Sequence, residues 1–486
     1  MQTTDFIIIA LQTIFLLILG YYVILNLQWY HYKLTRVVFK HHKWRWHIYY
    51  FLIPILYFVL IPYDLYYYLG LLVYFVALGI WALTLSKKLV FTGRILRFFG
   101  IYIGFILFNE LLLLTINTHN ALIQFVHIIP LLIAIFLSAF LEKVLLNRYK
   151  QVAKDKLSIM PGLTIIAITG SYGKTSLKNF ISQILKAKYT VYSTPRSVNT
   201  LTGIIADINQ NLSSLTDIYV VEAGARESGD IREIIELLEP QIVVVGKVGE
   251  AHIEYFKSID KIYETKYEIL ESKRLQKVYI YKENTPPAFS PMPISYFPQN
   301  ISNINATLDG TEFSLVVKGS KLDFKTEVLG AFNATNISAA ISIAKDLGVE
   351  NELLIKQVAK LQPIHHRLNK ITVNNKIILD DSYNGNIDGM KEAIRLSSLY
   401  EGRKIIITPG LVESREKLNK ELAQEIDKVF DIAIITGELN SKILKNNIFN
   451  AQKIILKDRS NIETLLKNVS LEKDLILFAN DAPSYI

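Results

Sequence analysis

The sequence contains no cysteine among its 486 residues. This absence excludes disulfide bonds, thiolate zinc sites, iron–sulfur clusters and a cysteine nucleophile, but it does not identify the compartment. Negative charge is also scarce, because 53 Lys and Arg residues outnumber 44 Asp and Glu residues and give a formal net charge of +9. The basic residues gather beside apolar segments, where anionic lipid headgroups and the positive-inside rule account for them. We therefore expect no nucleic-acid partner.

Apolar residues are abundant, by contrast, and form five runs within residues 1–150. They make up 51% of the chain, which indicates that part of it lies in lipid. A helix of about 20 residues crosses the hydrocarbon core of a bilayer. The runs that we predict as transmembrane helices are residues 6–27, 48–62, 66–86, 98–116 and 121–141, of which the second is short and contains Pro54.

The positions of Lys and Arg predict the orientation of these helices. Basic residues follow the first, third and fifth runs, whereas residues 1–5, 62–65 and 117–120 contain none. Because basic loops stay on the cytosolic side, we expect the N-terminus outside and everything beyond residue 142 in the cytosol. The sequence therefore predicts a multi-pass protein of the cytoplasmic (inner) membrane, with the lipid bilayer as a partner and its soluble part exposed to ATP.

Two ionisable residues, Glu110 and His127, lie inside predicted spans. Charged groups are costly at bilayer depth, so they either line a pocket, here for a lipid-linked substrate, or form hydrogen bonds between neighbouring helices. We prefer the second interpretation.

From about residue 163 the pattern changes to short apolar runs that alternate with amphipathic segments. Residues 164–168, 218–222 and 242–245 are predicted as buried parallel strands of a nucleotide-binding α/β domain, followed by a proline-rich stretch and a few short strands. A second series begins near residue 329 and predicts a doubly wound, Rossmann-like domain. Its expected strands are residues 376–379, 404–408, 432–435, 453–456 and 475–478. The predicted domains are residues 1–150 (membrane), 151–328 (central, ATP-binding) and 329–486 (C-terminal).

A phosphate-binding loop follows the first predicted strand. Residues 169–176 read Thr-Gly-Ser-Tyr-Gly-Lys-Thr-Ser and precede a helical stretch, so backbone N–H groups and a helix N-terminus would face an anion. Lys174 would contact the β- and γ-phosphates and Thr175 would hold Mg²⁺. The strict pattern has Gly where this chain has Ile168, so the loop is a variant. The residues that we predict to bind ATP here are Gly170, Ser171, Gly173, Lys174, Thr175 and Ser176.

Three further residues follow in an order that suits metal-assisted phosphoryl transfer. Glu222 ends a predicted strand, where P-loop folds place a carboxylate for the metal. His252 follows the next strand, and Lys266 comes 14 residues later in a helical stretch. Taken singly, His252 would be a surface or core histidine and Lys266 a solvated lysine. Their order and spacing favour a functional role.

Residues 163–420 resemble the Mur ligase family, in particular its UDP-N-acetylmuramoyl-tripeptide:D-alanyl-D-alanine ligase branch. The segments that carry the resemblance are residues 169–176, Asn199 with Gly203, residues 222–225, 252–254, 266–269, 329–336, 366–368 and 380–386. The resemblance implies a P-loop ATPase domain of Mur type, a Rossmann-like last domain and an ATP-dependent ligase that joins an acid to an amino acid through an acyl phosphate.

The same resemblance implies the roles of individual residues. Thr175 and Glu222 would hold one Mg²⁺, and His252 with a carbamylated Lys266 would serve a second. Lys174 would stabilise charge on the transferred phosphoryl group. The residues that would complete the catalytic and nucleotide-contacting set are Asn333, Asn336, Arg367 and Asp381, with Arg367 and Asp381 acting from the last domain on ATP and on the amine. Amide, ADP and phosphate would be the products.

Departures from the family pattern concern the substrates. The predicted membrane helices stand where this branch has its UDP-sugar domain, so we expect a lipid-linked or bilayer-presented carboxylate of cell-wall (peptidoglycan) synthesis and an amino acid or dipeptide as the amine. Thr200 and Ile387 replace an Asn and a Pro of the pattern. Residues 479–483 replace a Lys-Gly-Ser-Arg signature, and Asp481 within them either binds an ammonium group or is a solvated loop carboxylate, which is the commoner case.

Two alternatives stay open on the sequence alone. One is a polymerising ligase similar to the membrane-associated poly-γ-glutamate synthases, which product length would separate from a single-addition enzyme. The other is a P-loop ATPase that drives transport through its own membrane domain. ATP hydrolysis without any amine would favour the ATPase.

Overall fold

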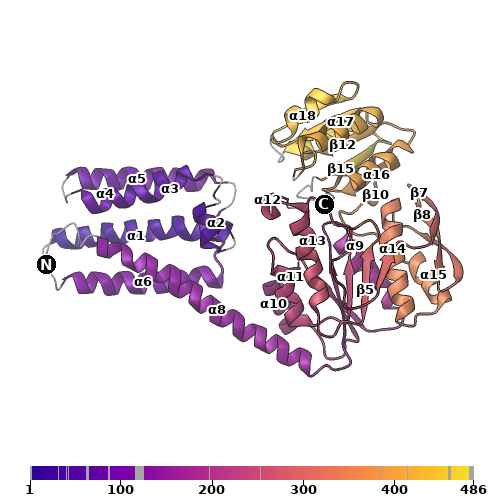
Figure 1. Ribbon diagram of the computed structural model, residues 1–486. Helices are drawn as coiled ribbons and strands as arrows, with labels where there is room; N and C mark the ends of the chain where they lie inside the picture. Colours follow the sequence, from indigo (N-terminus) through magenta and orange to yellow (C-terminus); the bar gives the residue numbers. More distant parts are fainter. Residues whose placement is uncertain are drawn as a thin grey trace. The chain divides into compact units, whose positions relative to one another are not determined.

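The computed structural model describes residues 3–30, 32–39, 41, 43–61, 65–85, 88–114, 125–195, 198–251, 253–383, 385–412, 414–457 and 461–480. The chain divides into two compact units, Met1–Arg148 and Tyr149–Ile486, coloured indigo to magenta and magenta to yellow in Figure 1.

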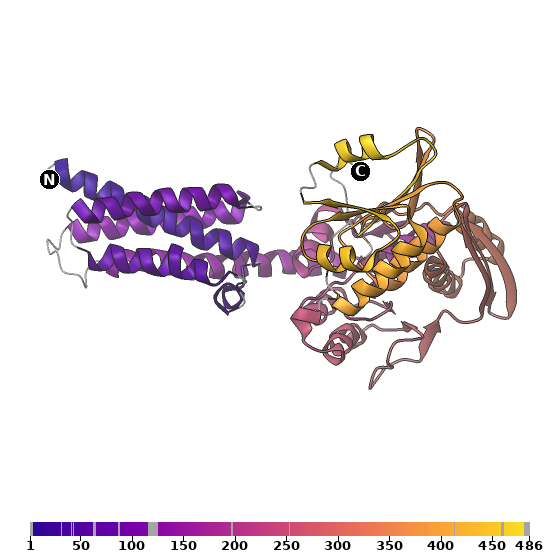
Figure 2. The ribbon, with the colours of Figure 1, turned by 90° about the horizontal axis from the view of Figure 1, so that it is seen from above.

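The first unit is helical. Its long helices are α1 (Thr3–Trp29), α5 (Leu65–Thr84), α6 (Gly93–Leu114) and α8 (Ile129–Ser158), and α1 packs against both α5 and α6 (Figure 2). Shorter elements are α2 (Leu34–Phe39), α3 (Arg45–His47), the π-helical η1 (Ile48–Leu52), α4 (Ile53–Leu60) and the 3₁₀-helix η2 (Phe125–Ile128). Side chains such as Phe15, Phe58 and Tyr102 fill the core between them.

Four described helices are long and apolar enough to cross a membrane. They are Ile9–Trp29, Leu65–Thr84, Gly93–Leu113 and Phe125–Ser158. The second predicted run falls on the shorter apolar helix Arg45–Leu60, which contains the π-helical turn. Pro54 has no N–H to donate to the carbonyl oxygen of Tyr50, and the hydroxyl of Tyr74 donates to that oxygen at 3.1 Å.

Glu110 and His127 contact each other inside the first unit. His127 Nδ1 lies 2.9 Å from Glu110 Oε1, and both side chains are buried. They come from α6 and η2, so the pair joins two helical segments, as the preferred interpretation of the sequence expected.

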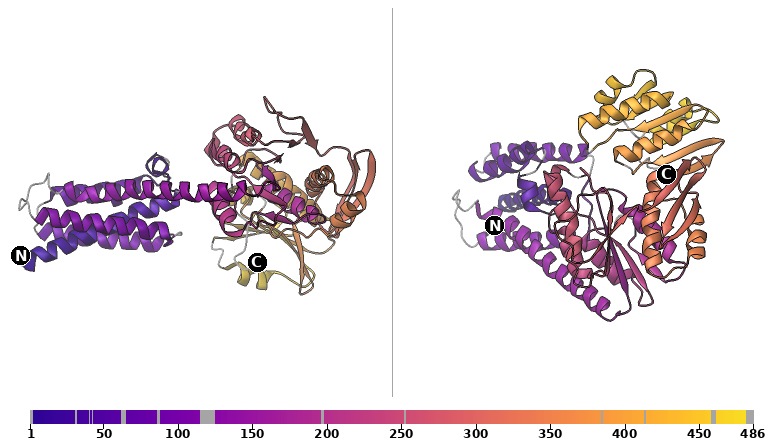
Figure 3. Two further views of the ribbon diagram at one scale, coloured as in Figure 1. Left: turned by 90° about the horizontal axis from the view of Figure 1, so that it is seen from below. Right: turned by 45° about the vertical axis from the view of Figure 1, so that its right-hand side comes forward.

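The second unit begins with a parallel sheet in the order β2-β3-β1-β4-β5-β6. Its strands are β1 (Thr164–Thr169), β2 (Val191–Ser193), β3 (Ile218–Glu222), β4 (Ile242–Val245), β5 (Lys277–Tyr281) and β6 (Ile294–Phe297), and the three strands predicted for this region coincide with β1, β3 and β4. Ile166 and Ile168 join one core with α9 (Lys174–Leu185), whereas Ala167 joins another with α11 (Asp230–Leu238) and α13 (Ile259–Tyr267). Helices therefore cover both faces of this sheet (Figure 3).

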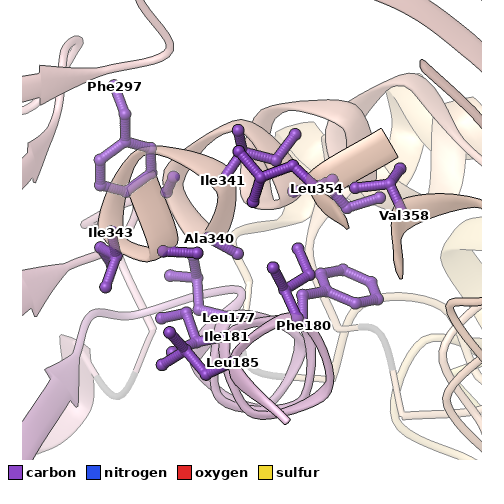
Figure 4. Close-up of a cluster of buried hydrophobic side chains, with 14 of the residues drawn as sticks. Leu177, Phe180, Ile181, Leu185, Phe297, Ala340, Ile341, Ile343, Leu354 and Val358 are labelled. Carbon is purple, nitrogen blue, oxygen red and sulfur yellow. The ribbon is translucent and has the colours of Figure 1, made fainter. Parts of the chain in front are cut away.

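The remaining elements of this half are α10 (Leu201–Asn211), α12 (Ile253–Phe256), η3 (Glu268–Glu271) and an antiparallel sheet of β7 (Ile301–Thr307), β8 (Gly310–Val317) and β9 (Ser320–Thr326). After them come α14 (Ala331–Asp346) and α15 (Asn351–Ala359). Figure 4 shows how Leu177, Phe180 and Ile181 of α9 meet Ala340 of α14 and Leu354 of α15 in one apolar cluster. This packing fixes the position of α9 directly behind the phosphate-binding loop.

A second six-stranded sheet has the order β10-β11-β15-β12-β13-β14, in which only the β10–β11 pair is antiparallel. Its strands are β10 (Asn369–Val373), β11 (Lys376–Asp381), β12 (Lys404–Thr408), β13 (Ile432–Thr436), β14 (Gln452–Leu456) and β15 (Leu475–Ala479). The connecting helices are α16 (Ile387–Ser398), α17 (Glu416–Val429), α18 (Ser441–Asn447) and α19 (Ile462–Val469). All five predicted strands lie in this sheet, and its crossovers give the expected doubly wound arrangement.

Candidate active site

The predicted phosphate-binding loop connects β1 to the N-terminus of α9. Gly170 and Gly173 have φ angles of 147° and 75°, and a Cβ atom on Gly170 would lie 3.2 Å from the Cα atom of Gly246. Only glycine suits such a position. The N–H groups of Ser171 and Tyr172 donate to the carbonyl oxygen of Lys247 at 2.9 and 3.0 Å, which fixes the loop against the chain that follows β4. The positive end of the α9 dipole then faces whatever the loop binds.

Lys174 lies over this loop. Its ammonium donates to the carbonyl oxygens of Gly170 at 2.8 Å and Ser171 at 3.2 Å. Burial lowers the pKa of Lys174, the carboxylate of Glu222 opposes this, and the guanidinium of Arg367 lowers it further. Two cations, one from each sheet region, thus converge on one place and repel each other. Such a place favours a polyvalent anion.

Thr175 and Glu222 meet next to Lys174. Glu222 is paired in register with Ile168, and its buried carboxylate accepts a hydrogen bond from the Thr175 hydroxyl at 3.0 Å and one from Asn199 Nδ2 at 3.2 Å. A hydroxyl and a carboxylate are oxygen ligands of the kind that Mg²⁺ takes together with phosphate and water. In the part of the chain that the structure describes, no group of three or more His, Asp and Glu gathers as a metal site, so the other ligands would come from the nucleotide and solvent.

Lys266 lies in the last turn of α13 and is buried, which contradicts the bland expectation of a solvated lysine. Burial and, to a smaller extent, the Lys174 ammonium lower the pKa of Lys266 to about 7, against the opposing effect of Asp230, Glu268 and Glu222. A large neutral fraction of the amine is what addition of carbon dioxide requires. His252, its predicted metal-binding partner, lies outside the described residues, as does Asp481.

The last part of the chain provides the opposite wall. Asn333 is buried and donates from Nδ2 to the carbonyl oxygen of Leu329 at 2.8 Å, while Asn336 comes within 3.3 Å of where a Cβ atom on Gly173 would lie. Asp381 ends β11 and is buried. Arg367 precedes β10 and is half-buried.

These residues surround a pocket of about 1650 Å³. The predicted site residues that line it are Ser171, Gly173, Lys174, Thr175, Ser176, Glu222, Asn336, Arg367 and Asp381. Gly170, Asn333 and Lys266 are described but do not contribute to its lining. The pocket also has lining residues that the sequence did not single out, among them Lys178, Arg226, Lys247 and Asp388.

Two ion pairs cross from the first sheet region to the second beside this pocket. Lys247 contacts Asp388 at the start of α16, and Arg415 before α17 lies 3.0 Å from Glu250. The four side chains of these two ion pairs are all partly exposed. No sequence signal could have paired these residues, because each pair joins positions more than about a hundred residues apart whose proximity depends on the fold.

Known proteins resemble this chain over the part that contains the pocket. The Mur ligase middle domain matches residues 168–344. The chain is 28% identical over 355 residues to the UDP-N-acetylmuramoyl-tripeptide–D-alanyl-D-alanine ligase of Bacillus subtilis, covering 68% of this chain and 76% of that protein. It is also 28% identical over 335 residues to the ligase of that name from Buchnera aphidicola, covering 64% and 72%.

Solved structures agree in fold. MurF from Acinetobacter baumannii has a TM-score of 0.59 at 22% identity and covers 68% of this chain and 77% of its own. MurF ligase from Thermotoga maritima, solved in complex with ADP, has a TM-score of 0.58 at 23% identity, with 69% and 80% covered.

The P-loop, the acid beside it and these relatives define an ATP-dependent ligase that joins an acid to an amino acid. Over residues 168–344 the chain carries the Mur ligase middle domain, and it is similar to the branch of that family named after UDP-N-acetylmuramoyl-tripeptide and D-alanyl-D-alanine.

Proposed function

We propose that this protein is a membrane-anchored ligase that adds an amino acid or dipeptide to a carboxylate of a peptidoglycan-type precursor. The observation that carries the proposal is the Thr175–Glu222 contact of 3.0 Å beside Lys174, in a pocket that Arg367 and Asp381 enter from the second sheet region. Two relatives that are 28% identical to the chain are named UDP-N-acetylmuramoyl-tripeptide–D-alanyl-D-alanine ligases.

The residues suggest how the two steps occur. The acceptor carboxylate attacks the γ-phosphorus of ATP, ADP leaves, and the amine then attacks the acyl carbon, so that phosphate leaves and the nitrogen loses a proton. Lys174 and Arg367 balance the negative charge that spreads over the phosphoryl oxygens. Thr175 and Glu222 would hold Mg²⁺, which supplies further positive charge at the phosphates. Asp381, which is buried at the end of β11, would receive the amine.

Lys266 is proposed to act as a carbamate together with His252 at a second metal site. The pKa of about 7 supports this role, because the neutral amine is the form that reacts with carbon dioxide. The carbamate is an anion, and an anion suits a buried position near the Lys174 ammonium and a metal.

The membrane anchor is proposed from the surface of the first unit. Large apolar side chains are exposed along its helices, including Leu72, Val73, Val76, Ile80, Leu83, Leu96, Leu107, Phe108, Leu111, Phe136 and Phe140. On helix α2 the charged side chain of Arg36 is buried while the apolar side chains of Val38 and Phe39 are exposed, which is the reverse of the usual pattern in a soluble protein. Such surfaces suit lipid tails and the headgroup boundary. With the basic residues on the cytosolic side, the ligase unit would face the cytosol and a lipid-linked acceptor would reach it at the bilayer.

The test uses the full chain in lipid nanodiscs with ATP, Mg²⁺ and bicarbonate, and measures phosphate release. We expect release only when both a carboxylate acceptor and an amine are present, and no release from Lys174→Ala. Lys356→Met, an exposed change on α15, serves as the matched lysine control. UDP-linked and lipid-linked muramoyl peptides in parallel decide how the acceptor is presented. Rapid release without acceptor and amine would refute the ligase and favour an ATPase.

A further inference from the structure

Lys178 is a buried cation for which the steps above have no role. It lies on α9 one turn after Lys174 and is only 2% exposed. Its ammonium donates to the carbonyl oxygens of Thr194 at 2.7 Å and Pro195 at 3.3 Å, and it lies 3.8 Å from Oε2 of Glu222. A lysine this deeply buried requires partners, and here the partners belong to the metal side of the pocket.

The residues that Lys178 contacts also hold Glu222 in place. The Thr194 hydroxyl accepts a hydrogen bond from the N–H of Glu222 at 3.3 Å. Asn199 donates to Oε1 of Glu222 at 3.2 Å, and its own carbonyl oxygen accepts from Gly224 at 2.8 Å. Lys178 therefore contacts the carboxylate on one side and, on the other, the backbone that restrains it.

We propose that Lys178 is a positioning residue that fixes the Glu222 carboxylate for Mg²⁺ bound with the nucleotide. This inference rests on the proposed function only in taking Thr175 and Glu222 as ligands of Mg²⁺. Without the ammonium, the carbonyl oxygens of Thr194 and Pro195 lose their shared donor, and Oε2 of Glu222 keeps the Thr175 hydroxyl but loses the ammonium beside it. Residues that support a metal ligand in this way typically change metal affinity by about 10- to 100-fold.

The experiment compares Lys178→Met with the unaltered full chain in nanodiscs. Calorimetry measures binding of ADP without metal, and then binding of Mg²⁺ to the protein saturated with ADP. We expect the dissociation constant of Mg²⁺ to rise about tenfold, because the carboxylate is no longer held, and ADP binding without metal to change by less than about twofold. Lys356→Met is the control. Lys178→Arg keeps the charge in a larger side chain, and we expect an intermediate loss of Mg²⁺ affinity.

Each other outcome overturns the proposal. Unchanged or tighter Mg²⁺ binding by folded Lys178→Met would mean that the ammonium only repels the metal or fills space. An equal loss of ADP binding with and without Mg²⁺ would indicate general damage to α9. If Lys178→Met does not fold, Lys178→Arg decides, and normal Mg²⁺ affinity in that variant refutes the role. If the unaltered chain binds ADP but no Mg²⁺, the proposed metal site itself fails and this role with it.

Discussion

The first and second units each bury an acid beside a base, with opposite surroundings. In the first unit Glu110 lies 2.9 Å from His127, and the His127 ring packs edge-on against Phe58 in the helical core. In the second unit Glu222 lies 3.8 Å from Lys178, contacts Thr175 and Asn199, and lines a large pocket. The comparison teaches that burial of a charge does not by itself indicate chemistry. Glu222 differs from Glu110 because it lines a pocket and lies beside the Thr175 hydroxyl.

The same substitution in both units tests this contrast, and we expect its largest effect at Glu222. Glu222→Gln removes the negative charge next to Thr175, so ligase turnover should fall by about 100-fold or more at saturating ATP. The chain should still unfold cooperatively but at a somewhat lower temperature, because the amide keeps one of the two acceptor oxygens that Glu222 presents to Thr175 and Asn199. Glu312→Gln on the exposed surface of β8 is the control. Turnover within about twofold of normal would remove Glu222 from the site.

Lys266 should make activity depend on pH and bicarbonate together. Because its pKa lies near 7, the reactive neutral amine increases as pH rises from about 6 to about 8. In buffer freed of carbon dioxide, added bicarbonate should therefore activate the enzyme more strongly at the higher pH. Lys266→Arg should abolish this response. Activity that ignores bicarbonate at every pH would contradict the carbamate.

Glu110→Gln should have the opposite signature to Glu222→Gln. We expect ligase turnover to stay within about twofold, since nothing in the described part of the pocket involves this residue. The stability of the first unit should fall by about 1 kcal/mol, as for other hydrogen bonds between membrane helices. Thermal unfolding in detergent measures this, and His127→Gln should cost no more once Glu110 is changed. A large loss of turnover would indicate that the pair serves the reaction.

The smallest effect is expected from the pair of Arg415 and Glu250. Both side chains are substantially exposed, so Arg415→Glu should change the free energy of unfolding by less than about 1 kcal/mol. A larger effect on KM for ATP would show that the pair holds the two sheet regions together during turnover. Reversal of both charges, with Glu250→Arg added, should restore the normal KM in that case.

The strands and the phosphate-binding loop were predictable because their signals are local. Runs of Ile and Val of strand length mark β1, β4 and β12, and glycine at two fixed positions marks the loop. The second predicted membrane span, residues 48–62, stays a prediction and falls on the apolar helix Arg45–Leu60, whose π-helical turn beside Pro54 a hydropathy run does not reveal.

Lys178 and the paired charges beside the pocket were not predictable for a different reason. A lysine on an amphipathic helix is typically solvated, whereas this one is buried against Thr194 and Pro195, which follow β2, and against Glu222 of β3. Ion pairs such as Lys247–Asp388 join residues whose sequence neighbours carry no matching pattern. The roles assigned to His252 and Asp481, outside the described residues, stay predictions.

Lys247 contacts both the phosphate-binding loop and the last part of the chain. Its carbonyl oxygen accepts the N–H groups of Ser171 and Tyr172, while its ammonium contacts Asp388 at the first turn of α16. The loop and the first turn of α16 therefore share one residue as a common support, which holds the loop by its backbone carbonyl and contacts α16 by its side-chain ammonium.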